Sequence, residues 1–391
     1  MLTGLARSGA PGIGSRLYKL TWEAVNYRLR GFAGGALAGY CRPTSIVILL
    51  TERCNARCLH CDIWKNRGKE DSPSLDEWKK VLTDIRQWLG PVQVTFSGGE
   101  ALLKPFATDL VAHGSAIGLF IELLTHGYWL EHARIERLAE ANPWRVTVSL
   151  DGLGSTHDRV RGRDGFFART ISSIETLRRA SQHRRTPLPI RLKTVVMSHN
   201  LSELGEVARF ARDRGLEVFY QPIEQNYNTP EDPRWFEHSD NWPKDTAAAV
   251  AAVSELMELK RRGLPIVNSR AQLEAMAAYF RDPDSLRVAV QSHSAHERRQ
   301  HCMALTMLQL QANGDVVVCT SLAPVGNVKG DSIRRIWEAR PRVWEEGCCL
   351  GRRSQPTPSS AGAVPRSETP ISAPRLPVST APGHVEGDHP G

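Results

Sequence analysis

The sequence lacks the features of membrane and nucleic-acid-binding proteins. No apolar run approaches the roughly 20 residues that a membrane-spanning helix needs. Glycines and basic residues interrupt the apolar residues near the N-terminus, so no signal peptide is predicted. The net charge is +8, but Lys and Arg alternate with acidic residues and form no long basic block. We therefore expect a solvated mixed surface, no transmembrane segment, no nucleic-acid partner and a cytoplasmic location.

The eight cysteines are too unevenly spaced for a disulfide framework. Three lie between positions 54 and 61, and four lie between 302 and 349. Such grouping is typical of metal ligation, and it indicates a reducing compartment. The chain has 391 residues, of which 41% are apolar, which is enough for one large domain and a smaller one.

The first cysteine group lies on a short loop after a predicted strand. Cys54, Cys58 and Cys61 are separated by three and two residues and follow the apolar run Ile46–Leu50. Three thiolates are too few to close a tetrahedral zinc site or to ligate every iron of a cubane cluster, unless a fourth ligand comes from elsewhere. One iron of such a cluster would be open to a small chelating ligand. The alternatives are a zinc site with a distant fourth ligand and three buried thiols.

From this loop onward, strand-like and helical patterns alternate. Ser74 and Glu77 form a capping box before an apolar face at helical spacing. Later helices are predicted over His132–Ala141, Phe167–Ala180 and Leu201–Arg214. Six strand-then-helix units indicate a parallel sheet, whose chemistry gathers at the C-terminal ends of the strands. The predicted strands are Ile46–Leu50, Val92–Phe96, Phe120–Leu124, Val146–Leu150, Leu192–Val196 and Val218–Gln221.

Glycines and polar side chains follow two of these strands directly. Ser97-Gly98-Gly99-Glu100 comes after the second strand, where the glycines allow close backbone approach and the carboxylate suits an ammonium group. The fourth strand ends in Ser149-Leu150-Asp151-Gly152, and Arg161 follows. A hydroxyl and a guanidinium are suited to orient a carboxylate. Taken alone, a tight turn explains Gly-Gly-Glu equally well, and a surface salt bridge explains Arg161.

In this order, the motifs resemble those of the radical S-adenosylmethionine (radical SAM) enzymes, in their SPASM and twitch branch. In that family the open iron of a [4Fe-4S] cluster chelates the amino and carboxylate groups of SAM, and one electron cleaves SAM to a 5′-deoxyadenosyl radical. The resemblance implies that Cys54, Cys58 and Cys61 hold this cluster. It also implies that SAM contacts Gly98, Gly99, Glu100, Ser149, Asp151 and Arg161.

The resemblance also implies the fold and the domain order. The fold class is α/β, a partial (β/α)6 radical SAM barrel with a small C-terminal iron-sulfur domain of the SPASM or twitch kind. We expect an N-terminal amphipathic segment, the barrel, a helical bridge, the cluster domain and a disordered tail. Their expected ranges are 1–43, 44–245, 246–300, 301–350 and 351–391.

The second cysteine group resembles the start of a SPASM or twitch domain. Cys302 and Cys319 flank a predicted β-hairpin with the turn Asn313-Gly314. The resemblance implies an auxiliary iron-sulfur cluster held by this pair and by Cys348 or Cys349. The adjacent Cys348 and Cys349 depart from the family pattern, which continues with further spaced cysteines. The other hypothesis is therefore a truncated or frame-shifted C-terminus with a damaged auxiliary site.

Two further stretches at the strand ends have open roles. Thr125-His126-Gly127 stands where the family often has Thr-Asn-Gly, so His126 is expected to line the pocket, and no catalytic acid or base is assigned. The aromatic loop between Glu224 and Trp242 either contacts substrate or packs on the barrel edge.

The expected activity is hydrogen-atom abstraction from a peptide or small-molecule substrate by the adenosyl radical, with flavodoxin or ferredoxin as the reductant. Oxidation, cross-linking and rearrangement are all compatible outcomes. One alternative is a zinc-binding module that holds nucleic acid without catalysis. Another is a radical SAM methyl or methylthio transferase, although no segment is long enough for the cobalamin or RNA-binding domain that such enzymes usually carry.

Overall fold

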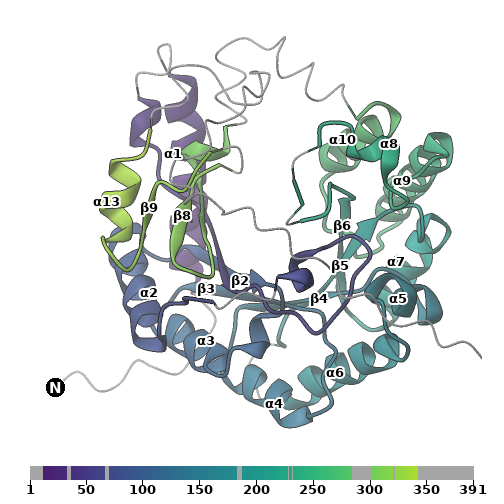
Figure 1. The fold of residues 1–391 in the computed structure, drawn as a ribbon, viewed down its shortest axis with the longest axis horizontal. Coiled ribbons are helices and arrows are strands. Elements are labelled where there is room, and N and C mark those ends of the chain that lie inside the picture. Colours follow the sequence, from purple (N-terminus) through teal and green to yellow (C-terminus); the bar gives the residue numbers. More distant parts are fainter. Residues whose placement is uncertain are drawn as a thin grey trace, which may run out of the picture. The chain divides into compact units, whose positions relative to one another are not determined.

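One β-sheet organises the protein (Figure 1). The computed structural model describes residues 12–32, 37–66, 70–182, 187–227, 229–230, 232–283, 302–319 and 322–341. Within these ranges, nine strands form one sheet in the order β6-β5-β4-β3-β2-β1-β7-β8-β9. They are β1 (Ser45–Thr51), β2 (Gln93–Gly98), β3 (Phe120–Thr125), β4 (Arg145–Ser149), β5 (Ile190–Val196), β6 (Glu217–Pro222), β7 (Met307–Leu310), β8 (Asp315–Val317) and β9 (Gly326–Asn327).

The first six strands are parallel and lie in sequence order, which confirms the predicted strand-then-helix units. The sheet is open, because β6 and β9 lie at its two edges. Figure 1 shows the connecting helices along one side of the sheet. They are α2 (Leu75–Leu89), α3 (Ala107–Ala116), α4 (His132–Glu140), α5 (Gly154–Arg161), α6 (Phe166–Ala180) and α7 (Leu204–Asp213).

Side-chain alternation gives the two faces of the sheet different characters. Toward the helices the strands present apolar residues such as Ile46, Ile48 and Leu50, all with no exposed surface. The other face carries polar residues. In register across β2, β3 and β4 these include Thr95, Glu122 and Arg145. The apolar face therefore forms the core with the helices, and the polar face leads to the strand ends.

The C-terminal hairpin extends the same sheet. β7 pairs in parallel with β1, and β8 pairs antiparallel with β7 across the predicted Asn313-Gly314 turn, where Gly314 has φ of +92°. Helix α13 (Ile333–Glu338) places Trp337 against Trp88 of α2, with ring centroids 6.3 Å apart. The predicted hairpin is confirmed, and Cys348 and Cys349 lie outside the described residues.

The N-terminal helix α1 (Ile13–Gly31) packs on the sheet by one face. The Asn26 side chain is buried and bonds both the N–H and the carbonyl of Arg42, while Arg30 donates to Thr306 Oγ1. These contacts join the N-terminal segment to the main domain, although Leu17 and Leu20 remain exposed. No helix in the described ranges has the length and apolar character to cross a bilayer.

The remaining helices follow β6 or form single turns. Helix α9 (Thr246–Arg261) and helix α10 (Arg270–Arg281) lie in the range 246–300, where a helical bridge was expected, and α8 (Trp235–His238) lies in the aromatic loop. The single 3-10 turns are η2 (Ala38–Tyr40), η3 (Ile63–Lys65), η4 (Ala101–Leu103), η5 (Leu201–Glu203) and η6 (Met303–Leu305).

Candidate active site

A cavity of about 330 Å³ lies at the C-terminal ends of the parallel strands. The cysteine loop forms one wall, and the ends of β2 to β6 form the others. This is the position that the strand-end motifs predicted. The sequence-predicted residues that line it are Cys54, Cys58, Cys61, Gly98, Gly99, Glu100, His126, Ser149 and Arg161.

The two glycines of the Gly-Gly-Glu motif hold the cysteine loop against β2. The Gly99 N–H donates to the Thr51 carbonyl at 2.7 Å, and the Glu100 N–H donates to the Arg53 carbonyl at 2.9 Å. A Cβ atom on Gly98 would lie 2.2 Å from the Thr51 oxygen, and one on Gly99 would lie 2.3 Å from the Arg53 oxygen. The packing of the cysteine loop therefore requires both glycines, whereas the sequence analysis explained them by a close ligand or a tight turn.

The three cysteines of the loop are free thiols at the cavity wall. Cys58 is buried, while Cys54 and Cys61 are partly buried. Burial raises the pKa of Cys54 to about 12, so a cationic centre would be needed to hold it as thiolate. In the described ranges, no three His, Cys, Asp or Glu side chains converge closely enough to hold a single metal ion. A cubane cluster instead takes each thiolate on a different iron.

Arg161 lies between the cysteine loop and a buried carboxylate. Its Nη1 donates to Cys58 Sγ at 3.4 Å, and its Nη2 lies 2.5 Å from Asp151 Oδ2. Asp151 has no exposed surface and does not line the cavity. Burial alone would raise the pKa of Asp151, but the Arg161 guanidinium lowers it. Asp151 therefore positions Arg161 from outside the cavity, whereas Arg161 itself lines the cavity.

Glu100 presents a buried carboxylate at the end of β2. Its Oε1 accepts from the Leu102 N–H at 3.1 Å, and its Oε2 accepts from the His126 N–H at 2.8 Å. Burial raises the pKa of this carboxyl group to about 7. The carboxylate is thus fixed by backbone donors and lines the cavity beside Cys54.

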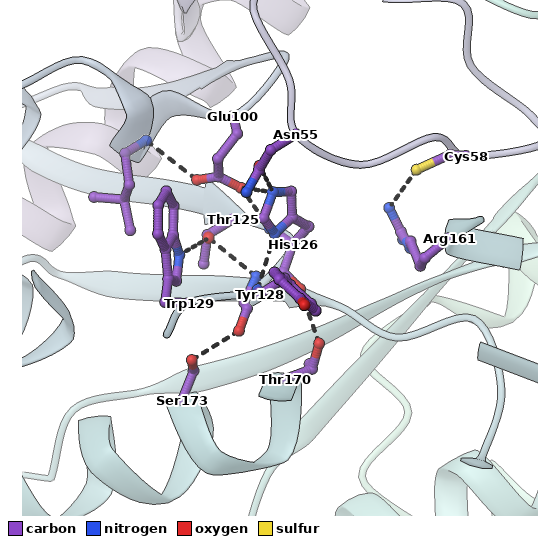
Figure 2. A network of polar contacts seen from close by, with 12 residues as sticks. Asn55, Cys58, Glu100, Thr125, His126, Tyr128, Trp129, Arg161, Thr170 and Ser173 are labelled. Atoms are coloured by element: carbon purple, nitrogen blue, oxygen red, sulfur yellow. Dashed lines mark hydrogen bonds and ion pairs between the residues drawn. The ribbon is translucent and has the colours of Figure 1, made fainter. Parts of the chain in front are cut away.

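His126 connects the end of β3 to the cysteine loop (Figure 2). Its Nδ1 accepts the Tyr128 N–H at 2.9 Å, and its Nε2 lies 2.7 Å from Asn55 Oδ1. The ring stacks on Trp129, with centroids 5.8 Å apart. Burial lowers the pKa of His126 to about 3, so the ring is neutral. Its contacts include a residue of the cysteine loop, which the sequence did not reveal.

The aromatic loop after β6 packs on the cysteine loop and also reaches the cavity, while its contact with substrate stays a prediction. Asn226 and Asn241 both donate to the Leu59 carbonyl, at 3.1 and 2.9 Å, and the Asp62 N–H donates to the Tyr227 carbonyl. The loop is thereby joined to the cysteine loop. Its residues Glu224, Gln225 and Tyr227 also line the cavity.

Other cavity residues were missed by the sequence reasoning. Lys193 on β5 and Glu224 after β6 carry opposite charges at the wall, together with His60 and Trp64. A signal for Lys193 was present, because a lysine alternates with apolar residues in Ile190–Val196 and so faces away from the core. No comparable sequence signal marks Glu224, His60 or Trp64.

Three buried nitrogen atoms without a hydrogen-bond partner indicate that a polar ligand would fit this cavity. His60 Nδ1, Trp64 Nε1 and Arg161 Nε are buried, and none of them makes a hydrogen bond within the described residues. Buried polar groups are normally paired, and all three residues line the cavity. Three thiols, a fixed carboxylate and unpaired donors thus suit a cluster with an anionic, hydrogen-bonding ligand beside it.

Comparison with known families identifies the superfamily of the chain. The Radical SAM superfamily profile matches residues 48–211, which span the cysteine loop, both strand-end motifs and most of the parallel strands. The chain belongs to the radical SAM superfamily. The predicted membership and the α/β fold class are confirmed, with an open sheet, and the chain is a radical SAM enzyme with SPASM-type relatives.

Curated relatives and a solved structure agree with this membership. The AdoMet-dependent heme synthase of Methanosarcina barkeri is 28% identical over 313 residues, which are 76% of this chain and 82% of the synthase. The PqqA peptide cyclase of Rhodopseudomonas palustris is 32% identical over 172 residues, but this match spans only 43% of this chain and 44% of the cyclase. Streptococcus suis SuiB bound to S-adenosylmethionine shares the fold, with a TM-score of 0.58 and 14% identity over 76% of this chain and 66% of SuiB.

Proposed function

We propose that this radical SAM enzyme cleaves SAM reductively at a [4Fe-4S] cluster held by Cys54, Cys58 and Cys61, and abstracts a hydrogen atom from a peptide or small molecule. The observation that carries the proposal is one cavity lined by the three thiols, Glu100, Ser149 and Arg161. When bound, an iron-sulfur cluster with one open iron supplies the chelating site and the electron that cleaves SAM.

The residues of the chain orient SAM by charge and hydrogen bonding. The Arg161 guanidinium, held in place by Asp151, provides a fixed positive charge for the SAM carboxylate, and Ser149 lines the same cavity. The Glu100 carboxylate provides the opposite charge for the SAM ammonium group. This separation of charges gives SAM one orientation against the cysteine loop.

The substrate side of the cavity is marked by charged residues that the SAM motifs do not include. Neither the Lys193 side chain nor the Glu224 side chain makes a hydrogen bond or ion pair with another described residue, although each is close enough to shift the other's pKa. Burial lowers the pKa of Lys193 and raises that of Glu224. A substrate with charged groups, such as a peptide or a carboxylated small molecule, would satisfy both.

An auxiliary cluster and an electron donor complete the proposal. Cys302 and Cys319 are both buried beside the C-terminal hairpin, as a shared cluster would require. We propose one auxiliary cluster held by this pair and by Cys348 or Cys349, and a flavodoxin or ferredoxin as the reductant. The domain ranges expected from the sequence remain part of this proposal.

Arg161→Met tests the SAM site in anaerobically reconstituted protein. With dithionite as reductant, the wild type is expected to convert SAM to 5′-deoxyadenosine and methionine, measured by chromatography. Losing a charge-assisted hydrogen bond of about 2 to 3 kcal/mol should slow this cleavage by roughly 30- to 160-fold. Arg159→Met is the matched control, because Arg159 lies on the same helix but is exposed, and its side chain donates to the His199 carbonyl.

Two results would count against the proposal, and each would refute a different part of it. Iron-loaded wild type that yields no 5′-deoxyadenosine would refute SAM cleavage itself. Equal cleavage by the Arg161→Met and Arg159→Met proteins would refute only the role given to Arg161.

A further inference from the structure

The cysteine loop has a stretch with little support from its own backbone. Arg57 and Leu59 donate to the carbonyls of Arg161 and Val160, and Arg53 accepts from Glu100. Between these anchors, residues 54–56 make no backbone-to-backbone hydrogen bond with any other described residue. Cys54 lies in this stretch, so its position depends on side-chain contacts.

The His126 ring supplies such a contact, and its protonation is fixed by its surroundings. Because the Tyr128 N–H donates to Nδ1, this nitrogen must be an acceptor, and the ring proton of a neutral histidine lies on Nε2. Nε2 then donates to Asn55 Oδ1 at 2.7 Å, with Glu100 Oε2 at 3.3 Å as its other neighbour. The hydrogen bond therefore has a single direction, from His126 to Asn55.

The protein around His126 holds the ring rigidly. Thr170 Oγ1 donates to the His126 carbonyl at 3.0 Å, and Ser173 Oγ donates to the Gly127 carbonyl at 2.7 Å (Figure 2). Trp129 stacks on one face of the ring, and Phe166 contacts it edge-on with centroids 5.2 Å apart. Only 4% of His126 is exposed. A donor held by so many contacts can restrain the Asn55 side chain.

We propose that His126 is a positioning residue, which holds Asn55 and thereby places the Cys54 thiol at the cavity wall. This inference rests on the proposed cluster function of Cys54. The imidazole suits the task because it accepts at one end and donates at the other. An asparagine at position 126 has a shorter side chain and could not do both.

The test compares the rate at which iron leaves the reconstituted proteins for the chelator ferrozine under anaerobic conditions. His126→Ala and Asn55→Ala should each release iron about fivefold faster, the effect of losing one hydrogen bond of about 1 kcal/mol. The double variant should release iron no faster than either single variant, because both remove the same bond. His126→Gln should restore a nearly wild-type rate, because its amide nitrogen can take the place of Nε2.

His132→Ala is the control, since His132 bonds Thr176 at 2.6 Å and does not line the cavity. Unchanged rates in both single variants, or a multiplied effect of about 25-fold in the double variant, would overturn the proposal. Wild type that binds no iron through Cys54 would instead refute the proposed function.

A second measurement does not depend on the cluster. In the iron-free full-length protein, peptide-level mass spectrometry can follow the alkylation of Cys54 by iodoacetamide. His126→Ala should raise this rate by about fivefold if the bond restrains the loop. An unchanged rate would overturn the positioning role whether or not the cluster function holds.

Discussion

Gly98→Ala is expected to destabilise the protein by about 4 kcal/mol, near the upper end for a single substitution. Gly98 has φ of +122°, which side-chain-bearing residues rarely adopt, and its new Cβ would lie 2.2 Å from the Thr51 carbonyl oxygen. The backbone of β1 cannot move away, because it is paired with both β2 and β7. Urea unfolding of the full chain, followed by circular dichroism, measures the loss.

Gly165→Ala is the control that separates the cost of the steric clash at Gly98 from the cost of a side chain in the left-handed region. Gly165 has φ of +74°, also in the left-handed region, but nothing lies within 4 Å of its added Cβ. We expect this variant to lose only about 1 kcal/mol, the cost of the conformation alone. If the Gly98 and Gly165 variants were equally stable, the packing of the cysteine loop against β2 would be wrong.

Glu122→Gln is expected to destabilise the protein by about 3 to 5 kcal/mol, because it leaves a buried charge unpaired. The Glu122 carboxylate accepts two hydrogen bonds from the Arg145 guanidinium, from Nε at 2.9 Å and from Nη2 at 2.6 Å. Gln93 and Thr147 donate to the same carboxylate from the neighbouring strands. The Gln amide oxygen would still accept a hydrogen bond from Arg145, but its NH2 group would place a donor against the Arg145 donors. Urea unfolding would measure the resulting loss of stability.

The matched control is Glu217→Gln. Glu217 pairs with Arg191 at 2.7 Å on the next strands of the same sheet, but its side chain is 46% exposed. Solvent screens such a pair, so we expect a loss below about 1 kcal/mol. Equal losses in the two variants would contradict the account of a buried polar network under the cavity.

The same network predicts a pH dependence of stability. Burial alone would raise the pKa of Glu122, but the Arg145 guanidinium and the hydrogen bonds lower it below its ordinary value of 4.5. The stabilisation is therefore fully present above the unfolded pKa, and it is lost as the pH falls through the lower, folded pKa. Glu122→Gln should lack this acid-dependent part of the unfolding free energy.

The local elements of the fold were predictable because their signals lie close together in the sequence. The capping box at Ser74 and Glu77 forms as expected and begins α2 one residue later. Apolar runs also marked each parallel strand to within a few residues. The sequence analysis gave no range for helix α5, which is short and mostly polar, and none for α3, whose His, Gly and Ser weaken the apolar pattern.

The site was predictable as a set of motifs but not as a set of contacts. The Cys, Gly-Gly-Glu and Ser-Leu-Asp-Gly segments do meet at one cavity. Yet the bond between His126 and Asn55 joins residues 71 positions apart, and that between Asn241 and Leu59 joins residues 182 apart. Such pairs depend on the packed fold, so no local pattern could reveal them. Asp151 pairs with Arg161 and does not line the cavity, so its expected contact with SAM stays a prediction.

Iron and sulfide content, with an EPR spectrum, tests the central claim most directly. The anaerobically reconstituted wild type is compared with the triple Cys54, Cys58 and Cys61→Ala variant, and Cys41→Ala serves as the control because Cys41 is buried outside the cavity. We predict that the triple variant loses about four irons, the content of one cubane cluster, and that the wild-type signal shifts when SAM is added. Any iron that remains in the triple variant would be assigned to the auxiliary cluster. Undiminished iron in the triple variant, or zinc in place of iron in the wild type, would contradict the account.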